Sequence, residues 1–378
     1  MMVDGKTWND VKRIAIYGFG RQGKGYISQF ENEFEITAII DNGKNQEKFY
    51  REIPIVTLET YVSAFPKSLI IVTAAGKAYT EIRESLSVLG MIENIDYADA
   101  DVFQMLRGWE KNRSINLGRL SIPITERCTL RCKNCITHMP YFSEPQDYRI
   151  QDLRDDFQRL FQMVDYIGCL NIVGGEPFLN HELYEVLDEL DIEYKDQIGQ
   201  IIIITNGTVL PDSKTMEKIA SLDKVEVRIS DYSQTIPYAN RIEKLIDSFQ
   251  EKRVRYTIEK FERWLYMGFP KDCISVSNTT DGIYEHMMEC NGRCQFFSKG
   301  RYYYCSRQWA AEKAFGMELV SDDIVDLRVL NDFEMSKEVK KKKLLDYHLG
   351  RFTRGYCDYC NKCWGFDQGQ EIKAAEQV

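Results

Sequence analysis

The sequence has no long apolar run and no excess of positive charge. No stretch of about eighteen consecutive apolar residues occurs, so we expect no membrane-spanning helix. Residues 1–10 contain acidic side chains and no apolar segment typical of a secretion signal, which favours a cytoplasmic protein. The formal net charge of −9 argues against a nucleic-acid partner and against binding to an anionic membrane, because both attract basic proteins. A small-molecule substrate is therefore favoured.

Cysteine, in contrast, is abundant, with 11 among 378 residues. In a reducing compartment, cysteines at short spacings indicate metal or iron–sulfur binding rather than disulfide bonds. Ten of them form two groups. The first group is Cys128, Cys132 and Cys135, and the second, later group is Cys273, Cys290, Cys294, Cys305, Cys357, Cys360 and Cys363. We therefore expect metal binding at both groups.

The first group lies on a loop that follows an expected strand, Leu120–Thr125. Three closely spaced thiolates can bind three irons of a cubane and leave the fourth iron for another ligand. After the next expected strand, Cys169–Val173, comes the stretch Gly174-Gly175-Glu176-Pro177. Its glycines expose backbone groups at the end of a strand, and its carboxylate can accept hydrogen bonds from an ammonium group.

The two motifs together resemble the CxxxCxxC and GGEP signatures of radical SAM enzymes. The resemblance implies that the first cysteine group holds a [4Fe-4S] cluster whose open iron chelates S-adenosylmethionine (SAM). In that family the cluster donates an electron that breaks SAM into a 5′-deoxyadenosyl radical, which abstracts hydrogen from the substrate. The resemblance also implies the SAM contacts, which follow successive strands: Gly174, Gly175, Glu176, Pro177, Asn206, Arg228 and Ser230.

Some of these residues have simpler interpretations. Asn206 belongs to a Thr-Asn-Gly stretch that is also an ordinary turn sequence, and Arg228 alternates with apolar neighbours as a solvent-facing strand residue would. Asn134 occupies a position where the family commonly has an aromatic residue near the adenine, so adenine packing must come from elsewhere. His138, close behind the third cysteine, faces the cluster or the substrate, or else lies at the surface or behind the residues that contact them.

Strand and helix signals alternate between Leu120 and Glu259, which predicts parallel strands joined by crossover helices. The expected fold class is α/β. The resemblance implies a partial (β/α)6 radical SAM barrel at residues 119–270, with the chemistry at the carboxyl ends of the strands.

The second cysteine group begins with Cys290, Gly300 and Cys305 at x9 and x4 spacing. Lys299-Gly300 before an aromatic strand predicts a hairpin that presents Cys305. The arrangement resembles the twitch domain of radical SAM proteins, a shortened relative of the SPASM domain. It implies an iron–sulfur domain at residues 271–378 with one auxiliary [4Fe-4S] cluster.

Four cysteines suffice to close this second cluster. The expected ligands are Cys290, Cys305, Cys357 and Cys360. Cys294 and Cys363 are then left over, either as substitute ligands or as hydrogen donors to a substrate radical. A tetrahedral zinc site is the alternative to a cluster, because paired thiolates also suit zinc.

The first third of the chain predicts a nucleotide-type fold. An expected strand leads into Gly18, Gly20 and Gly23, then into a helix, and the next strand ends in Asp41. Such glycines let helix N–H groups approach a diphosphate, and the acid lies where a ribose-binding acid is expected. Three interpretations remain open: an NAD site, a site for a nucleotide-sugar-like substrate, and a docking domain that binds no ligand.

Residues 13–103 resemble the Rossmann-like N-terminal domains of sugar acetyltransferases and other surface-polysaccharide enzymes. Those domains often carry an acidic pair where this chain has Asp41-Asn42, so only the first acid is present. We expect this domain to span residues 1–107 and to be followed by a linker at residues 107–118.

These features predict a radical SAM enzyme that abstracts hydrogen from a carbinol carbon of a nucleotide-activated sugar or polyol, in glycan or cell-surface polymer biosynthesis. The outcome is epimerisation if a cysteine returns hydrogen, or oxidation if the auxiliary cluster takes a second electron. An electron donor such as flavodoxin or ferredoxin is implied. The alternatives are modification of a ribosomally made peptide and a non-enzymatic iron–sulfur redox protein.

Overall fold

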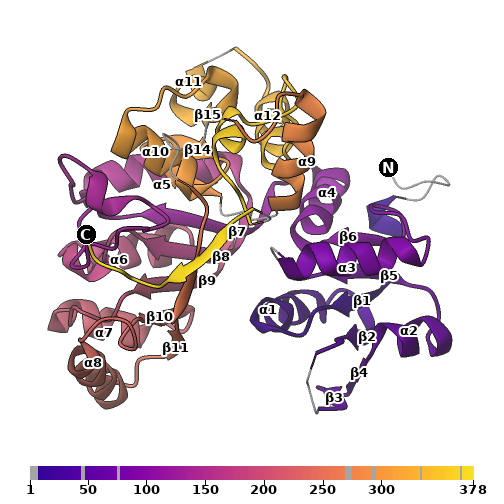
Figure 1. The fold of residues 1–378 in the computed structure, drawn as a ribbon, viewed down its shortest axis with the longest axis horizontal. Coiled ribbons are helices and arrows are strands. Elements are labelled where there is room, and N and C mark those ends of the chain that lie inside the picture. Colours follow the sequence, from indigo (N-terminus) through magenta and orange to yellow (C-terminus); the bar gives the residue numbers. More distant parts are fainter. Residues whose placement is uncertain are drawn as a thin grey trace. The chain divides into compact units, whose positions relative to one another are not determined.

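The computed structural model describes residues 7–43, 47–74, 77–268, 275–290, 295–332, 334–366 and 368–378. The chain divides into two compact units, Met1–Gly118 and Arg119–Val378 (Figure 1). The second unit holds residues 119–270 and 271–378 together, which the sequence pattern had placed in separate domains. Among the described residues, none of the helices is both long and apolar enough to cross a membrane.

The first unit is a sheet with helices on both faces. Its strand order is β3-β4-β2-β1-β5-β6, in which β3 is antiparallel and the other strands are parallel. The strands are β1 (Arg13–Tyr17), β2 (Glu35–Ile40), β3 (Phe49–Tyr50), β4 (Ile53–Val56), β5 (Leu69–Val72) and β6 (Tyr97–Asp99); the helices are α1 (Arg21–Phe30), α2 (Leu58–Ala64), α3 (Lys77–Val88) and α4 (Ala100–Asn112).

The alternation of side chains along β1 explains why both faces are covered. Ile14 and Ile16 belong to one apolar core together with Phe103 of α4 and residues of α1. Ala15 and Tyr17 belong to a second core with residues of α2 and α3. Because successive strand residues point to opposite faces, a strand with four successive apolar residues, as β1 has from Ile14 to Tyr17, must be buried between two layers of helices.

The expected linker is mostly regular structure. Helix α4 continues to Asn112, and strand β7 begins at Asn116. Arg113 ends the helix in a left-handed conformation (φ 57°), and its N–H donates to the carbonyls of Gly108 and Trp109. The chain therefore passes from the first unit to the second within strand β7 rather than within an irregular segment.

The second unit is built on an eight-stranded sheet in the order β11-β10-β9-β8-β7-β13-β14-β15. Strands β8 to β11 are parallel, with one helix in each connection, as the alternating pattern predicted. The strands are β7 (Asn116–Pro123), β8 (Tyr166–Val173), β9 (Ile198–Thr205), β10 (Val225–Asp231), β11 (Tyr256–Lys260), β13 (Phe296–Ser298), β14 (Arg301–Tyr303) and β15 (Ile324–Asp326). The helices are α5 (Ile150–Met163), α6 (Leu183–Glu193), α7 (Ser213–Ser221), α8 (Ala239–Lys252), α9 (Thr280–Cys290), α10 (Ser306–Phe315), α11 (Leu327–Asp332) and α12 (Lys337–His348).

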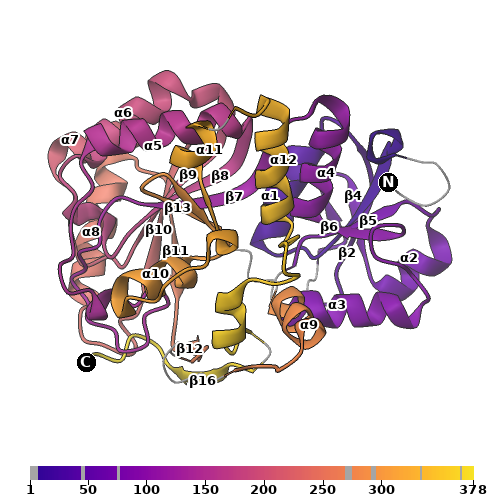
Figure 2. The same cartoon turned by 90° about the horizontal axis from the view of Figure 1, so that it is seen from above.

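The segment that carries the second cysteine group extends this same sheet. Strand β13 pairs with β7 through Phe296 and Ser121. The predicted hairpin is confirmed by the antiparallel pairing of Phe296 with Tyr303. Lys299 (φ 51°) and Gly300 (φ 74°) both have the left-handed conformation that a tight two-residue hairpin requires. A separate antiparallel ribbon is formed by β12 (Arg263–Tyr266) and β16 (Gln370–Lys373), which lie side by side in Figure 2.

Candidate functional site

The first cysteine loop begins just after β7 and packs against the glycine loop that follows β8. Glu176 N donates to Arg127 O at 2.8 Å. A Cβ atom on Gly175 would lie 2.2 Å from Arg127 O and 2.7 Å from Cys128 Cβ, and Gly174 is similarly crowded. The two glycines are therefore required because two backbones touch here, which is a different reason from the exposure to a ligand that the sequence suggested.

The Glu176 carboxylate is fully buried and holds two strand ends together. It accepts hydrogen bonds from Thr205 Oγ1 (2.7 Å), Asn206 N (2.8 Å) and Phe178 N (3.2 Å). Burial raises the pKa of Glu176 to about 7, although these hydrogen bonds oppose the shift. Pro177 opens a single helical turn next to it. The carboxylate thus links the end of β8 to the end of β9, and its expected contact with the SAM ammonium stays a prediction.

Asn206 points an amide group at the first cysteine. Its Nδ2 lies 3.6 Å from Cys128 Sγ and 3.2 Å from Thr129 Oγ1, while its Oδ1 accepts from Thr208 N at 3.0 Å. A backbone N–H can only donate, so this contact fixes which end of the amide faces the thiol. Asn206 is thus part of the cysteine site as well as of a turn.

The middle cysteine is contacted by a residue from the far end of the sequence. Gln377 Nε2 lies 3.4 Å from Cys132 Sγ. Burial raises the pKa of Cys128 well above its usual range and that of Cys132 to about 11. These thiols are therefore protonated at neutral pH until a metal displaces the proton. Sequence reasoning missed Gln377, because a lone glutamine far along the chain carries no recognisable signal.

Two of the expected SAM contacts, Arg228 and Ser230, lie on strand β10. Arg228 Nε lies 3.9 Å from Glu259 Oε1 of the neighbouring strand, and Ser230 is buried. The next aromatic residue, Tyr232, packs edge-on against Trp264 with ring centroids 5.2 Å apart. Burial raises the pKa of Tyr232, and the cysteines of the first group raise it further, so this ring lies beside the cysteine loop. Its position directly after the end of β10 was the available sequence signal.

His138 is an interior residue, which excludes the surface alternative. It is 2% exposed, and its ring lies 5.2 Å from that of Phe315. Burial, and secondarily the charge of Arg307, lowers the pKa of His138 to about 3. The imidazole is therefore neutral at physiological pH, and its backbone N–H donates to Cys135 O at 3.0 Å.

The second cysteine group surrounds a cavity. Four thiols line it: Cys290, Cys305, Cys360 and Cys363. The structure therefore places Cys363, which was expected to be left over, with three of the expected ligands. Cys357 does not line the cavity, but its hydrogen bond with Cys360 raises the pKa of that thiol, so it lies next to the other four. Cys273 and Cys294 lie outside the described residues. Over the described ranges, no three Cys, His, Asp or Glu side chains converge closely enough to hold a single metal ion.

A buried cation lies among these thiols. Arg307 lines the cavity, is 7% exposed and donates to the carbonyl of Gly268. Its Nε makes no hydrogen bond with any residue that the structure describes. Burial opposes its charge, but Tyr359, Cys363 and Cys305 raise the pKa of Arg307 above its usual range. A buried guanidinium beside four thiols, with one N–H group still without a partner among the described residues, fits an anionic group such as an iron–sulfur cluster with thiolate ligands.

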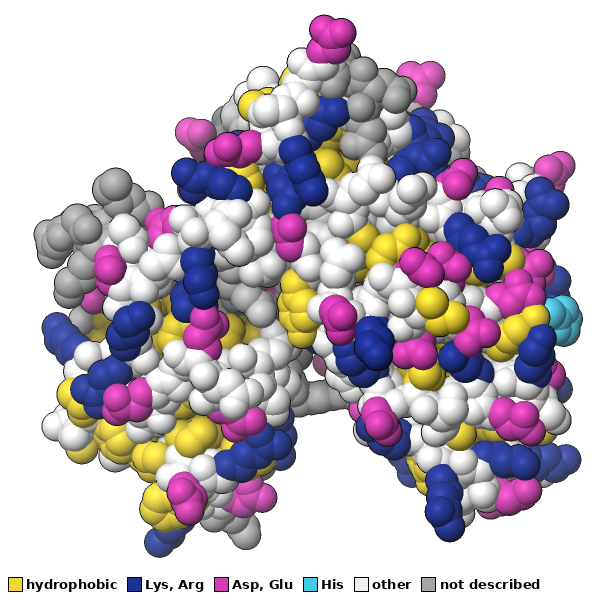
Figure 3. All heavy atoms as spheres, turned by 180° about the vertical axis from the view of Figure 1, so that it is seen from behind, with side chains coloured by type: hydrophobic (Ala, Val, Ile, Leu, Met, Phe, Trp, Pro, Cys, Tyr) yellow, Lys and Arg dark blue, Asp and Glu magenta, His cyan; other side chains and the backbone are white. Residues whose placement is uncertain are grey.

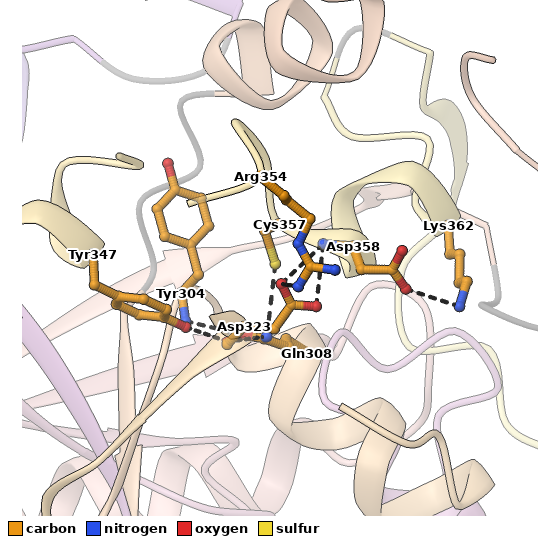
Figure 4. Close-up of polar contacts among 8 residues, drawn as sticks. All are labelled: Tyr304, Gln308, Asp323, Tyr347, Arg354, Cys357, Asp358 and Lys362. Atoms are coloured by element: carbon orange, nitrogen blue, oxygen red, sulfur yellow. Dashed lines mark hydrogen bonds and ion pairs between the residues drawn. The ribbon is translucent and has the colours of Figure 1, made fainter. Parts of the chain in front are cut away.

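Cys357 is held by the polar network in Figure 4. Gln308, which is fully buried, accepts from Tyr304 N (2.9 Å) and donates to the carbonyl of Asp323, and its Nε2 lies 3.6 Å from Cys357 Sγ. The Asp323 carboxylate accepts from Arg354 at 2.6 Å. This network fixes the loop that carries Cys357 against the segment after the hairpin, which presents Cys305.

The two cysteine groups share neighbours within the second unit. Ile136, directly after Cys135, lines the second cavity. Cys128 and Cys135 also pack against the apolar cluster of Trp309, on the helix that begins after Cys305. The cavity lined by the second cysteine group therefore begins one residue after the first group, at Ile136.

The glycine loop of the first unit lies at the carboxyl end of β1. Gly18 has a φ of 108°, and a Cβ atom on Gly23 would lie 2.0 Å from Gly18 O. Gly20 precedes helix α1. Phe19 N donates to the Asp41 carboxylate at 2.9 Å. Asp41 thus stabilises the loop itself, and a ribose would have to share this carboxylate.

Strand β7 of the mixed sheet leads into three cysteines on one loop. A glycine loop follows β8, and the amide donor Asn206 follows β9. This arrangement suits an iron–sulfur cluster. Residues 122–289 match the model of the radical SAM superfamily, so this part of the chain is a radical SAM domain.

The chain is similar to GTP 3′,8-cyclases. It is 34% identical to that of Clostridium acetobutylicum over 138 residues, which are 35% of this chain and 42% of that enzyme. It is 24% identical to that of Peptoclostridium acidaminophilum over 262 residues, which are 66% of this chain and 76% of that enzyme. The chain thus spans less than half of the first relative. Among solved structures it is similar to anSMEcpe with bound AdoMet, with 17% identity, coverage of 61% and 82%, and a TM-score of 0.39.

Proposed function

We propose that this chain is a radical SAM enzyme with two [4Fe-4S] clusters that oxidises a carbinol carbon of a nucleotide-linked sugar or polyol. The observation that carries the proposal is the adjacency of the two cysteine groups, with Ile136 reaching from the first loop into the second cavity. The finer architecture we propose is a Rossmann-like first unit, a partial (β/α)6 barrel and a twitch-like segment.

Cys128, Cys132 and Cys135 would hold the first cluster. With SAM bound, this cluster supplies the electron that generates the hydrogen-abstracting radical. The chain orients the thiols: Asn206 donates toward Cys128, and the glycine loop fixes the backbone before it. The ring of Tyr232 offers the flat apolar surface that a purine needs, which Asn134 cannot supply.

Cys290, Cys305, Cys360 and Cys363 would hold the second cluster, with Arg307 balancing part of its negative charge. This assignment replaces Cys357 by Cys363 in the ligand set. A cluster there would supply an acceptor for one electron. We propose oxidation rather than epimerisation because of this acceptor; Cys363, one of the two candidate hydrogen donors, is then used as a ligand.

The glycine loop of the first unit is proposed to bind a nucleotide. The strand order reverses direction between β1 and β5, and ligands of open parallel sheets bind at such points. Acidic and basic side chains are interspersed on the face drawn in Figure 3, as suits a small substrate better than a polyanion.

A second candidate substrate is a free nucleoside triphosphate. It is favoured by the 34% identity to a protein named GTP 3′,8-cyclase. Peptide modification and a non-enzymatic redox role are the remaining alternatives.

The test is anaerobic reconstitution of the full chain with iron counting, followed by reduction with SAM and flavodoxin or ferredoxin as electron donor. Two cubanes require about eight irons per chain. Nucleotide-sugars, nucleotide-polyols, GTP and a peptide are then compared for 5′-deoxyadenosine formation. A ketone product from a nucleotide-sugar or nucleotide-polyol supports the proposal, and turnover of GTP or peptide alone replaces it. If reduction with SAM yields no 5′-deoxyadenosine, a redox protein is favoured. When a cysteine of either group is replaced, Cys169→Ser is the matched control, because Cys169 lies on β8 outside both groups.

A further inference from the structure

Residues 374–378 are held against the first cysteine loop by the ribbon that precedes them. Strand β16 pairs with β12 from Tyr266 opposite Gln370 to Arg263 opposite Lys373, and Ala374 N continues the pairing to Glu262 O at 3.0 Å. Figure 2 shows β12 and β16 together, with the marked chain end beyond β16.

The chain then turns sharply onto the loop. Ala374 and Ala375 are both fully buried, and Ala375 has a left-handed φ of 54°. Left-handed backbone is unfavourable for a residue with a side chain, so the packing around these alanines must offset its cost. The turn brings residues 376–378 antiparallel to the cysteine loop.

Backbone hydrogen bonds fasten this segment on both sides of Cys132. Lys133 N donates to Glu376 O (2.7 Å), and Val378 N donates to Arg131 O (2.8 Å). Together they make Cys132 and Gln377 partners in an antiparallel bridge.

The side chain of Gln377 uses both ends of its amide within this site. Its Oε1 accepts from Arg131 N at 2.7 Å, and its Nε2 donates to Ala375 O at 2.6 Å and toward Cys132 Sγ at 3.4 Å. Because Arg131 N can only donate, Oε1 is fixed toward it and Nε2 is fixed toward the thiol.

We propose that residues 374–378 are a strap that completes the first cluster site, and that Gln377 is a positioning residue whose amide donates to the Cys132 thiolate. This inference rests on the proposed function, because it requires a cluster at the first cysteine group. A hydrogen bond to a cluster sulfur stabilises the more negative, reduced state and raises the reduction potential. The strap also covers Cys132, which is 6% exposed.

The test uses the anaerobically reconstituted full chain and three variants. Gln377→Leu removes the donor and the acceptor, and Gln377→Glu keeps an acceptor for Arg131 N but removes the donor. Gln370→Leu is the control, because Gln370 is an exposed residue of the same ribbon. The readouts are the midpoint potential of the cluster whose EPR spectrum changes on addition of SAM, and the rate of iron release to a chelator.

Both Gln377 variants are expected to lower this potential. Gln377→Leu is also expected to release iron about tenfold faster, because replacing a residue that hydrogen-bonds to a metal ligand typically weakens metal affinity by about that factor. Gln370→Leu should match the unmodified chain. If the SAM-sensitive cluster forms and both Gln377 variants leave its potential and iron release unchanged, the strap proposal is wrong while the proposed function stands. If the unmodified chain forms no SAM-sensitive cluster, the proposed function itself fails.

Discussion

Substitution of Gly175 by alanine tests whether the glycine loop serves the fold of the cysteine site or the exposure of backbone to a ligand. A Cβ atom there would lie 2.2 Å from Arg127 O, whereas real Cβ contacts are essentially never under 3.0 Å. The two segments must therefore separate by about 0.8 Å (3.0 minus 2.2). That movement would lengthen the 2.8 Å hydrogen bond from Glu176 N to Arg127 O beyond bonding distance.

The cost follows from these two effects. Overpacking costs about 1–3 kcal/mol and a lost hydrogen bond about 1 kcal/mol, so we expect a loss of about 2–4 kcal/mol in the free energy of unfolding. For a unit of this size, that loss lowers the melting temperature by on the order of 10 °C. Since Cys128 is next to the displaced Arg127, retention of iron by the first group should fall as well.

The assay is thermal unfolding of the metal-free chain, followed by iron counting after reconstitution. Gly25→Ala is the matched control, because it lies in helix α1 with nothing within 4 Å of the added Cβ, and it should leave the melting temperature unchanged or slightly higher. An unchanged melting temperature for Gly175→Ala, combined with weaker SAM binding, would refute the packing argument and restore the ligand-exposure role.

Two further predictions concern buried groups. Burial raises the pKa of Asp156 to about 6 despite hydrogen bonds from Lys299 N and Gly300 N, so its contribution to stability is present below about pH 4 and is lost as the pH rises through 6. Asp156→Asn lacks this titration, and its stability relative to the unmodified chain should therefore rise by about 3 kcal/mol between pH 4 and pH 7 in urea unfolding; parallel pH profiles would contradict this. Cys363→Ser should lose the irons of the second cluster, whereas Cys357→Ser should keep them, and the reverse pattern in iron counting would restore the ligand set expected from sequence.

Local patterns were sufficient for several elements of this fold. The alternation of apolar strands with amphipathic helices predicted the parallel strands β8 to β11, and Lys299-Gly300 predicted the hairpin, because short-range periodicity and backbone preference decide such elements. The second unit begins at Arg119, directly after the expected linker, but the structure of the linker was less predictable. Polar residues at 107–118 suggested a linker, yet helix α4 and strand β7 occupy most of it, since burial on one face is enough to stabilise a polar helix end.

Contacts between distant residues were beyond the sequence. The sequence indicated that the two positions after β8 need glycine. The close approach of Arg127 that requires glycine at Gly175 depends on how two loops pack. Arg307 carried no signal, because an arginine on an ordinary helix is usually exposed, and only tertiary packing buries it beside Cys305 and Cys363.

The sequence by itself predicted the chemistry proposed for the first site, because Cys128, Cys132 and Cys135 lie within eight consecutive residues and therefore share one loop. Only the tertiary structure decided what surrounds those thiols. The donor to Cys132 is Gln377, 245 positions later, and the thiols of the second cavity come from three separate segments. Contacts at such separations depend on the packing of the whole unit, which no local pattern specifies.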